Sequence, residues 1–185
     1  MSTDEASRSL AGHGTSTFYQ DALSQSKEFR EFYAQQKTIV KAEDMLWENS
    51  PQGRIKHMVN QSMNTKEYCL DVYQQFVAPG SRSGKHRHLS EEILYVLEGK
   101  GYDLHWDVNF DCQDAYVWQW QQEPQKLAWE EGDFVYIPPY TTHQHFNASA
   151  EDPVRFISVT SRIIKAMGFD WLDQLENAPE YRERE

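Results

Sequence analysis

From residue 54 to residue 162 the sequence consists of short runs in which apolar and polar residues alternate, separated by turns that contain glycine or proline. A period of two is typical of half-buried β-strands, and many short strands with regular turns favour an antiparallel sandwich or barrel. The pattern lacks the strand–helix alternation of a parallel sheet, so we predict an all-β fold. The runs expected to form strands are 68–77, 92–97, 102–106, 116–120, 126–129, 133–137, 144–147 and 155–160.

The segments on either side of this region have different patterns. Residues 1–16 are polar or charged with almost nothing to bury, which predicts a disordered tail. Within 17–53 the apolar residues recur at helical spacing up to about residue 37, so we expect a helical N-terminal segment. Residues 163–185 are expected to form a C-terminal helical segment and tail, with Gly168 dividing the helix. The chain is thus predicted to be one barrel domain, 54–162, bracketed by two helical segments.

The charge of the chain limits its partners. Eighteen Lys and Arg against 29 Asp and Glu give a net charge of −11, without a basic patch. Such a protein repels nucleic acids and anionic membrane surfaces, so we predict neither as a partner. The N-terminus has no basic start followed by an apolar run, as a signal peptide would, and the two cysteines have no disulfide-scaffold pattern. A cytoplasmic location is therefore expected.

Four residues form the strongest chemical signal. His86 and His88 are two apart, so on a strand both imidazoles lie on one face, and Glu92 follows after a short turn. A third histidine, His143, follows the proline-rich turn after residue 137. Neutral imidazoles with one carboxylate suit a borderline divalent cation such as Fe(II), Mn(II), Ni(II), Zn(II) or Co(II).

The spacing of these residues resembles that of the cupin superfamily. A first motif is matched by Gly80, His86, His88, Glu92 and Gly99, and a second by Gly132, Pro138, His143 and Asn147. Tyr140 stands where the family usually has glycine. The resemblance covers about residues 54–162 and implies a double-stranded β-helix, or jelly-roll barrel. It also implies that His86, His88, Glu92 and His143 bind one metal ion.

Several other residues are candidates for roles around this ion. His145 is two residues after His143 and is expected to point into the same barrel, as an acid–base group, a fifth ligand or a hydrogen-bonded interior histidine. Tyr140 would place a phenol near the barrel mouth. The candidate carboxylate clamps are Arg82, Arg87 and Arg155. The residues expected to line the pocket are Leu94, Val96, His105, Trp106, Trp118, Trp120, Trp129, Phe134 and Tyr136.

Three functions fit these residues. His145 and Tyr140 are the candidate catalytic residues, and one of them would be the acid–base group of a lyase or isomerase. The first function is an Fe(II)-dependent dioxygenase acting on a small aromatic or enolic acid. The chain resembles the small cupins grouped with gentisate-type dioxygenases, although Glu92 is a ligand that gentisate-type enzymes lack. The second is a lyase or isomerase using Zn(II), Ni(II) or Mn(II), and the third is a cupin that binds a small anion without turnover. A homodimer is expected in each case, with the N-terminal helix at the interface.

Overall fold

The computed structural model describes residues 16–66, 69–169 and 172–183, which belong to two units. The unit that ends at Gln36 contains helix α2 (Phe18–Ala34), which lies within the segment predicted to be helical. None of its residues is buried, and Phe18, Tyr19 and Phe32 are more than half exposed. The tail 1–16 lies outside the described residues except for Ser16. The homodimer with this helix at its interface stays a prediction.

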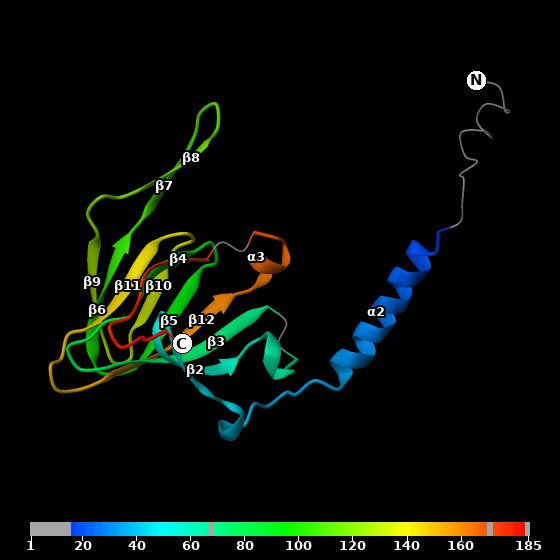
Figure 1. The fold of residues 1–185 in the computed structure, drawn as a ribbon, viewed down its shortest axis with the longest axis horizontal. Coiled ribbons are helices and arrows are strands. Elements are labelled where there is room, and N and C mark those ends of the chain that lie inside the picture. The colour runs from blue at the N-terminus through cyan, green and yellow to red at the C-terminus, as the bar shows by residue number, and fades with distance from the viewer. Residues whose placement is uncertain (1–15, 67–68, 170–171, 184–185) are drawn as a thin grey trace. The chain divides into compact units, whose positions relative to one another are not determined.

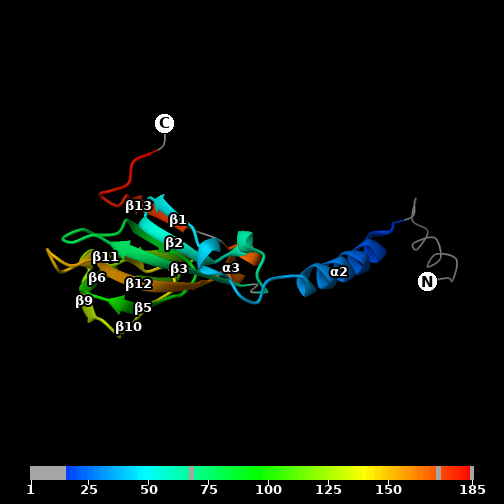
Figure 2. The same ribbon diagram turned by 90° about the horizontal axis from the view of Figure 1, so that it is seen from below.

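The unit that begins at Lys37 contains two antiparallel sheets. The six-stranded sheet has β3, β12 and β5 at its centre, and these strands run side by side in Figures 1 and 2. Every pairing in the sheet is antiparallel. In order its strands are β1 (Trp47–Ser50), β2 (Gly53–Val59), β3 (Leu70–Val77), β12 (Val154–Ser161), β5 (Glu92–Glu98) and β10 (Phe134–Ile137).

The second sheet has five strands and carries most of the histidines. In order its strands are β13 (Leu172–Glu176), β4 (Lys85–His88), β11 (Thr142–Asn147), β6 (Lys100–Trp106) and β9 (Gln125–Glu130). A separate hairpin, β7 (Val108–Cys112) and β8 (Tyr116–Trp120), projects beyond these strands (Figure 1). Short helical turns are η1 (Ala42–Asp44), η2 (Gln61–Met63) and α3 (Ile163–Ala166). No helix among the described residues combines the length and apolarity needed to cross a membrane.

The core lies between the two sheets, because each strand turns alternate side chains inward. Along β5, Glu92, Leu94 and Val96 are all buried, while Ile93 and Tyr95 are exposed. The inward direction predicted for Leu94 and Val96 is therefore confirmed. The buried apolar cluster consists of Val77, Leu94, Val96, Trp129, Val135, Ile137, Val154 and Phe156. This is the all-β jelly-roll architecture predicted from the sequence.

The direction predicted for β10 was wrong. Phe134 and Tyr136 were expected to line the interior, but they are 73% and 52% exposed, whereas Val135 and Ile137 are buried. The register explains the difference, since Val135 pairs with the inward-facing Leu94 and Ile137 with Glu92. Side chains of directly paired residues share one face of a sheet, so the partner strand decides which residues of β10 point inward.

The terminal segments also differ from the prediction in detail. Of the helix expected after residue 162, the described residues form only the single turn α3, and Leu172–Glu176 is strand β13, which pairs with β4. Gly168, with φ of +85°, lies just beyond α3 in a conformation that favours glycine. Residues 47–53, where no strand was predicted, include β1 and the start of β2. In both places pairing with a neighbouring strand outweighs the local pattern.

Candidate metal centre

The two sheets together supply the four predicted ligands. His86 and His88 lie on β4, and His143 lies on β11 directly opposite His86 in the register. Glu92 begins β5 on the other sheet. One ligand atom from each residue lies within 4.8 Å of the others. The sequence motifs therefore converge on one point between the sheets, where a single ion can contact all four side chains.

Hydrogen bonds to backbone carbonyls orient two of the imidazoles. His88 Nδ1 lies 2.7 Å from the Ser90 carbonyl oxygen, and His143 Nδ1 lies 3.0 Å from that of Thr141. Because a carbonyl oxygen only accepts, each Nδ1 carries the proton and donates. In the neutral ring Nε2 then keeps its lone pair. His88 Nε2 lies 3.0 Å and His143 Nε2 3.3 Å from Glu92 Oε2, which places both nitrogens at the shared point.

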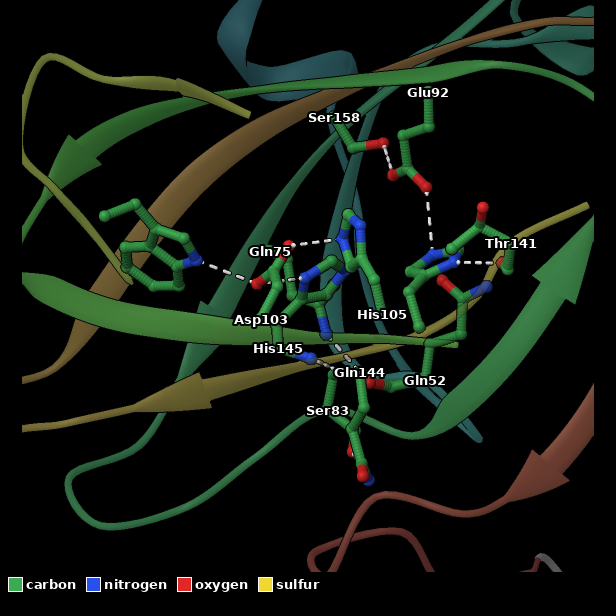
Figure 3. Close-up of polar contacts among 12 residues, drawn as sticks. Gln52, Gln75, Ser83, Glu92, Asp103, His105, Thr141, Gln144, His145 and Ser158 are labelled. Atoms are coloured by element: carbon green, nitrogen blue, oxygen red, sulfur yellow. Dashed lines mark hydrogen bonds and ion pairs between the residues drawn. The ribbon is translucent and has the colours of Figure 1, made fainter. Parts of the chain in front are cut away.

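Glu92 is held from the opposite side by two hydroxyl groups. Its Oε1 accepts hydrogen bonds from Tyr73 on β3, at 3.1 Å, and from Ser158 on β12, and Figure 3 shows the contact with Ser158. Its Oε2 faces the histidines. The carboxylate is fully buried. Burial opposes its charge, yet the adjacent imidazoles of His143 and His88 hold the pKa of Glu92 well below its ordinary value. An ionised carboxylate therefore faces the three imidazoles.

The donors present fit a divalent cation. Burial lowers the pKa of both His86 and His143, so the rings are neutral near pH 7, the form in which histidine binds a metal. Neither ring nitrogen of His86 has a hydrogen-bond partner among the described residues, although His86 is only 1% exposed. Unpartnered buried nitrogens are rare, and coordination of an ion would satisfy one of them. His86, His88, Glu92 and His143 would hold this ion.

The structure places Tyr140 away from the interior. Its ring packs against Trp118 and Trp120, with centroid distances of 5.4 and 5.2 Å. The guanidinium of Arg87 lies 5.2 Å from the same ring, and strand alternation puts Arg87 on the face of β4 opposite His86 and His88. Tyr140 also has φ of +63°, so the turn adopts the left-handed conformation that glycine accommodates most easily.

The other predicted pocket residues divide between the interior and the surface. Trp129 and His105 are buried, but Trp106 stacks beneath Lys85 Nζ at 3.9 Å, on the outer face of the sheet. Arg87 and Arg155 bind carboxylates of the protein itself, Asp173 and Glu98. Arg82 is exposed in the loop before β4. None of the three arginines is brought to the ligand cluster.

Sequence reasoning missed one interior residue, Asp103. It lies on β6 directly opposite His145 of β11, and its Oδ1 is 2.9 Å from His145 Nδ1. Both side chains are fully buried, so the interior direction predicted for His145 agrees with the structure. The alternation of β6 offers a signal that could have identified Asp103, because positions 101, 103 and 105 share one face and two of them are ionisable.

Comparison with known proteins agrees with this fold. A model of the auxin-binding protein family matches residues 33–174, which is more than half of the chain. The chain belongs to the auxin-binding protein family. This family has the cupin fold, so the resemblance predicted from the two histidine motifs is confirmed.

Among curated family members, the chain is similar to Auxin-binding protein T85 from Nicotiana tabacum and to Auxin-binding protein 4 from Zea mays. Each is 29% identical, over 50% and 53% of this chain and 46% and 43% of the relative. The chain thus matches less than half the length of these relatives. Among solved structures, vicilin from Corylus avellana (hazelnut) matches with a TM-score of 0.50 and 12% identity, covering 66% of this chain and 33% of that one. This likeness shows the fold alone.

Acidification is expected to release the metal, because protons compete with the ion for the histidine nitrogens. His88 is protonated first: burial opposes its charge, but its interaction with Glu92 raises its pKa. Burial lowers the pKa of His86 and His143, so their protonation requires a lower pH. Zinc retained by loaded protein after dialysis at stepped pH values measures the release, and a zinc content that does not fall as the pH is lowered would contradict this prediction.

Proposed function

We propose that the chain is a metal-dependent cupin that binds a small anionic, aromatic acid at this centre and, with Fe(II), oxidises it as a dioxygenase. The convergence of the four ligand atoms within 4.8 Å carries the proposal. Three neutral imidazoles and one carboxylate leave a divalent ion with a net charge near +1. In a buried site such a charge attracts an anion more strongly than it would in water.

The metal decides which chemistry is available. Fe(II) supplies electron transfer to O2, whereas Zn(II), Mn(II) or Ni(II) supplies Lewis acidity, and the ligand set alone accommodates each of them. The residues of the chain do the remaining work. The apolar side chains of the core exclude water around the acid, and Glu92, fixed by Tyr73 and Ser158, keeps its charge directed at the ion.

Of the two predicted catalytic residues, the geometry favours His145. Its ring centroid lies 5.4 Å from that of His143, and it is buried in the same interior. An imidazole in that place can exchange a proton with an acid bound at the centre. Tyr140, whose ring packs against two tryptophans, acts by shaping the turn that leads into β11.

The family supports binding of a small ligand. The relatives are named as auxin-binding proteins, and a chain of this family with a buried site for a divalent metal fits recognition of a small organic acid. Because this chain spans less than half of those relatives, their ligand remains a proposal here. A cupin that binds its ligand without turnover is accordingly the alternative with the most support.

Oxygen uptake by iron-loaded protein tests the dioxygenase function. We expect uptake with at least one member of a panel of aromatic and enolic acids, and none with zinc-loaded protein or with iron-loaded His86→Ala. Turnover without O2 in the zinc-, nickel- or manganese-loaded protein would instead indicate a lyase or isomerase. Saturable binding of an acid with no turnover under either condition would identify a binding protein.

A further inference from the structure

A second polar cluster lies inside the barrel beside the metal centre. The Asp103 cluster consists of Asp103 and His105 on β6, His145 on β11 and Trp129 on β9 (Figure 3). Their exposed fractions are 0%, 2%, 0% and 5%. The apolar side chains of this interior are mainly valine, leucine, isoleucine and phenylalanine, and they lie beside the buried candidate metal ligands and the buried Gln75 and Ser158. A buried carboxylate with two imidazoles stabilises a barrel less than apolar side chains of the same size would, so the cluster calls for another explanation.

One oxygen of Asp103 is held by two donors. Its Oδ1 accepts hydrogen bonds from Trp129 Nε1 at 2.8 Å and from His145 Nδ1 at 2.9 Å. Gly101 makes this arrangement possible, because a Cβ at that position would overlap the indole of Trp129. Burial opposes the charge of Asp103, but the electrostatic attraction of His145 and the hydrogen bonds hold the pKa of Asp103 well below its ordinary value. An oriented carboxylate and an oriented imidazole therefore stand side by side.

The remaining polar atoms of the cluster lack good partners. Asp103 Oδ2, His105 Nε2 and His145 Nε2 are buried without a hydrogen bond among the described residues. The separation of 3.5 Å between Asp103 Oδ2 and His105 Nε2 is at the limit of a hydrogen bond. Each unpartnered buried polar group destabilises the folded state. Such groups are retained where they meet a partner that the chain itself does not supply.

The cluster is within reach of a small molecule at the metal centre. The ring of His143 lies 5.4 Å from that of His145 and 6.2 Å from that of His105, measured between centroids. His143 also pairs with His105 in the register, and the pair of His145 and Asp103 lies two residues further along the same strands. The two sites therefore occupy consecutive layers of one interior, close enough for a single ligand to contact both.

We propose that Asp103 and His145 form a second subsite, which binds a hydroxyl group of the same ligand whose acid group is bound at the metal centre. A hydroxyl donates one hydrogen bond and accepts others, so it can donate to Asp103 Oδ2 and still pair with His145 Nε2 in either protonation state of the ring. The inference rests on the proposed function and narrows its substrate class to hydroxylated acids.

Calorimetric titration of zinc-loaded protein tests the subsite, since zinc permits binding without oxidation. The probes are benzoate and the three monohydroxybenzoates. We expect at least one hydroxybenzoate to bind about tenfold more tightly than benzoate, because a hydrogen bond to a charged group is worth roughly 1.5–3 kcal/mol. In Asp103→Asn most of this advantage disappears, while the zinc content and the affinity for benzoate stay unchanged.

Two further variants complete the test. If Asp103→Asn does not fold, His145→Phe takes its place in the test. It keeps a ring of similar shape without nitrogens and should lose the same advantage in affinity. Glu98→Gln, which changes a carboxylate paired with Arg155 outside the site, should retain it. Equal affinity for all four acids, or an advantage that persists in both Asp103→Asn and His145→Phe, would overturn the subsite alone. Failure of every acid to bind the zinc-loaded protein would overturn the proposed function as well.

Discussion

Replacing His86 by alanine is expected to abolish retention of the metal ion. His86 is almost fully buried, lies opposite His143 in the register and has both ring nitrogens without a protein partner among the described residues. Without the His86 imidazole three ligands remain, and the alanine methyl group leaves an empty apolar space in place of the coordinating nitrogen. We expect the metal content to fall from about one ion per chain to near zero, because no other side chain of the cluster can take its place.

The same substitution separates binding from folding. A ligand present at 100 to 1,000 times its dissociation constant stabilises the native state by roughly 2.7–4.1 kcal/mol. Added zinc should therefore raise the melting temperature of the unsubstituted protein but not that of His86→Ala. His57→Ala is the matched control, since His57 on β2 is paired with Glu48 on β1, outside the ligand cluster. Elemental analysis after purification without chelators gives the metal content, and a full ion in His86→Ala would remove this residue from the centre.

The grouping of the four candidate metal ligands was predictable from the two motifs that resemble those of the cupins. Within the first motif, His86 and His88 share a face of one strand by alternation alone. Leu94 and Val96 followed from Glu92 by the same alternation, and both are buried. Where one reference residue had a known direction, the rest of its strand could be assigned correctly.

The failures arose where direction depends on a partner strand. Nothing in the sequence of β10 indicates whether Phe134 or Val135 points inward, and only pairing with β5 decides it. Alternation along β6 could have placed Asp103 inside, but its contact with His145 likewise depends on the register of β6 and β11. Residues 172–176 are too few to distinguish a helical from a strand pattern, and β4 supplies the pairing that makes them a strand.

The substitution Phe156→Ala is expected to lower the free energy of unfolding by about 3–5 kcal/mol, as is usual for a fully buried phenylalanine. Phe156 is 0% exposed and belongs to the apolar cluster. Its ring lies 5.0 Å from that of His145 and 6.3 Å from that of Trp129, so it supports the Asp103 cluster from the core side. A loss of this size is a large share of the 5–15 kcal/mol that stabilises a typical domain.

Phe134→Ala is the matched comparison, since it removes the same ring from the outer face. Phe134 is 73% exposed and contacts the ring of Tyr95 at 4.8 Å, so its loss should cost no more than about 1 kcal/mol. Urea unfolding of both variants in the presence of a chelator gives the two free energies without a contribution from bound metal. Similar costs for the two substitutions would mean that β10 and β12 do not face the interior as described. A large cost for Phe156→Ala alone would establish that the metal centre and the Asp103 cluster lie against a close-packed apolar core.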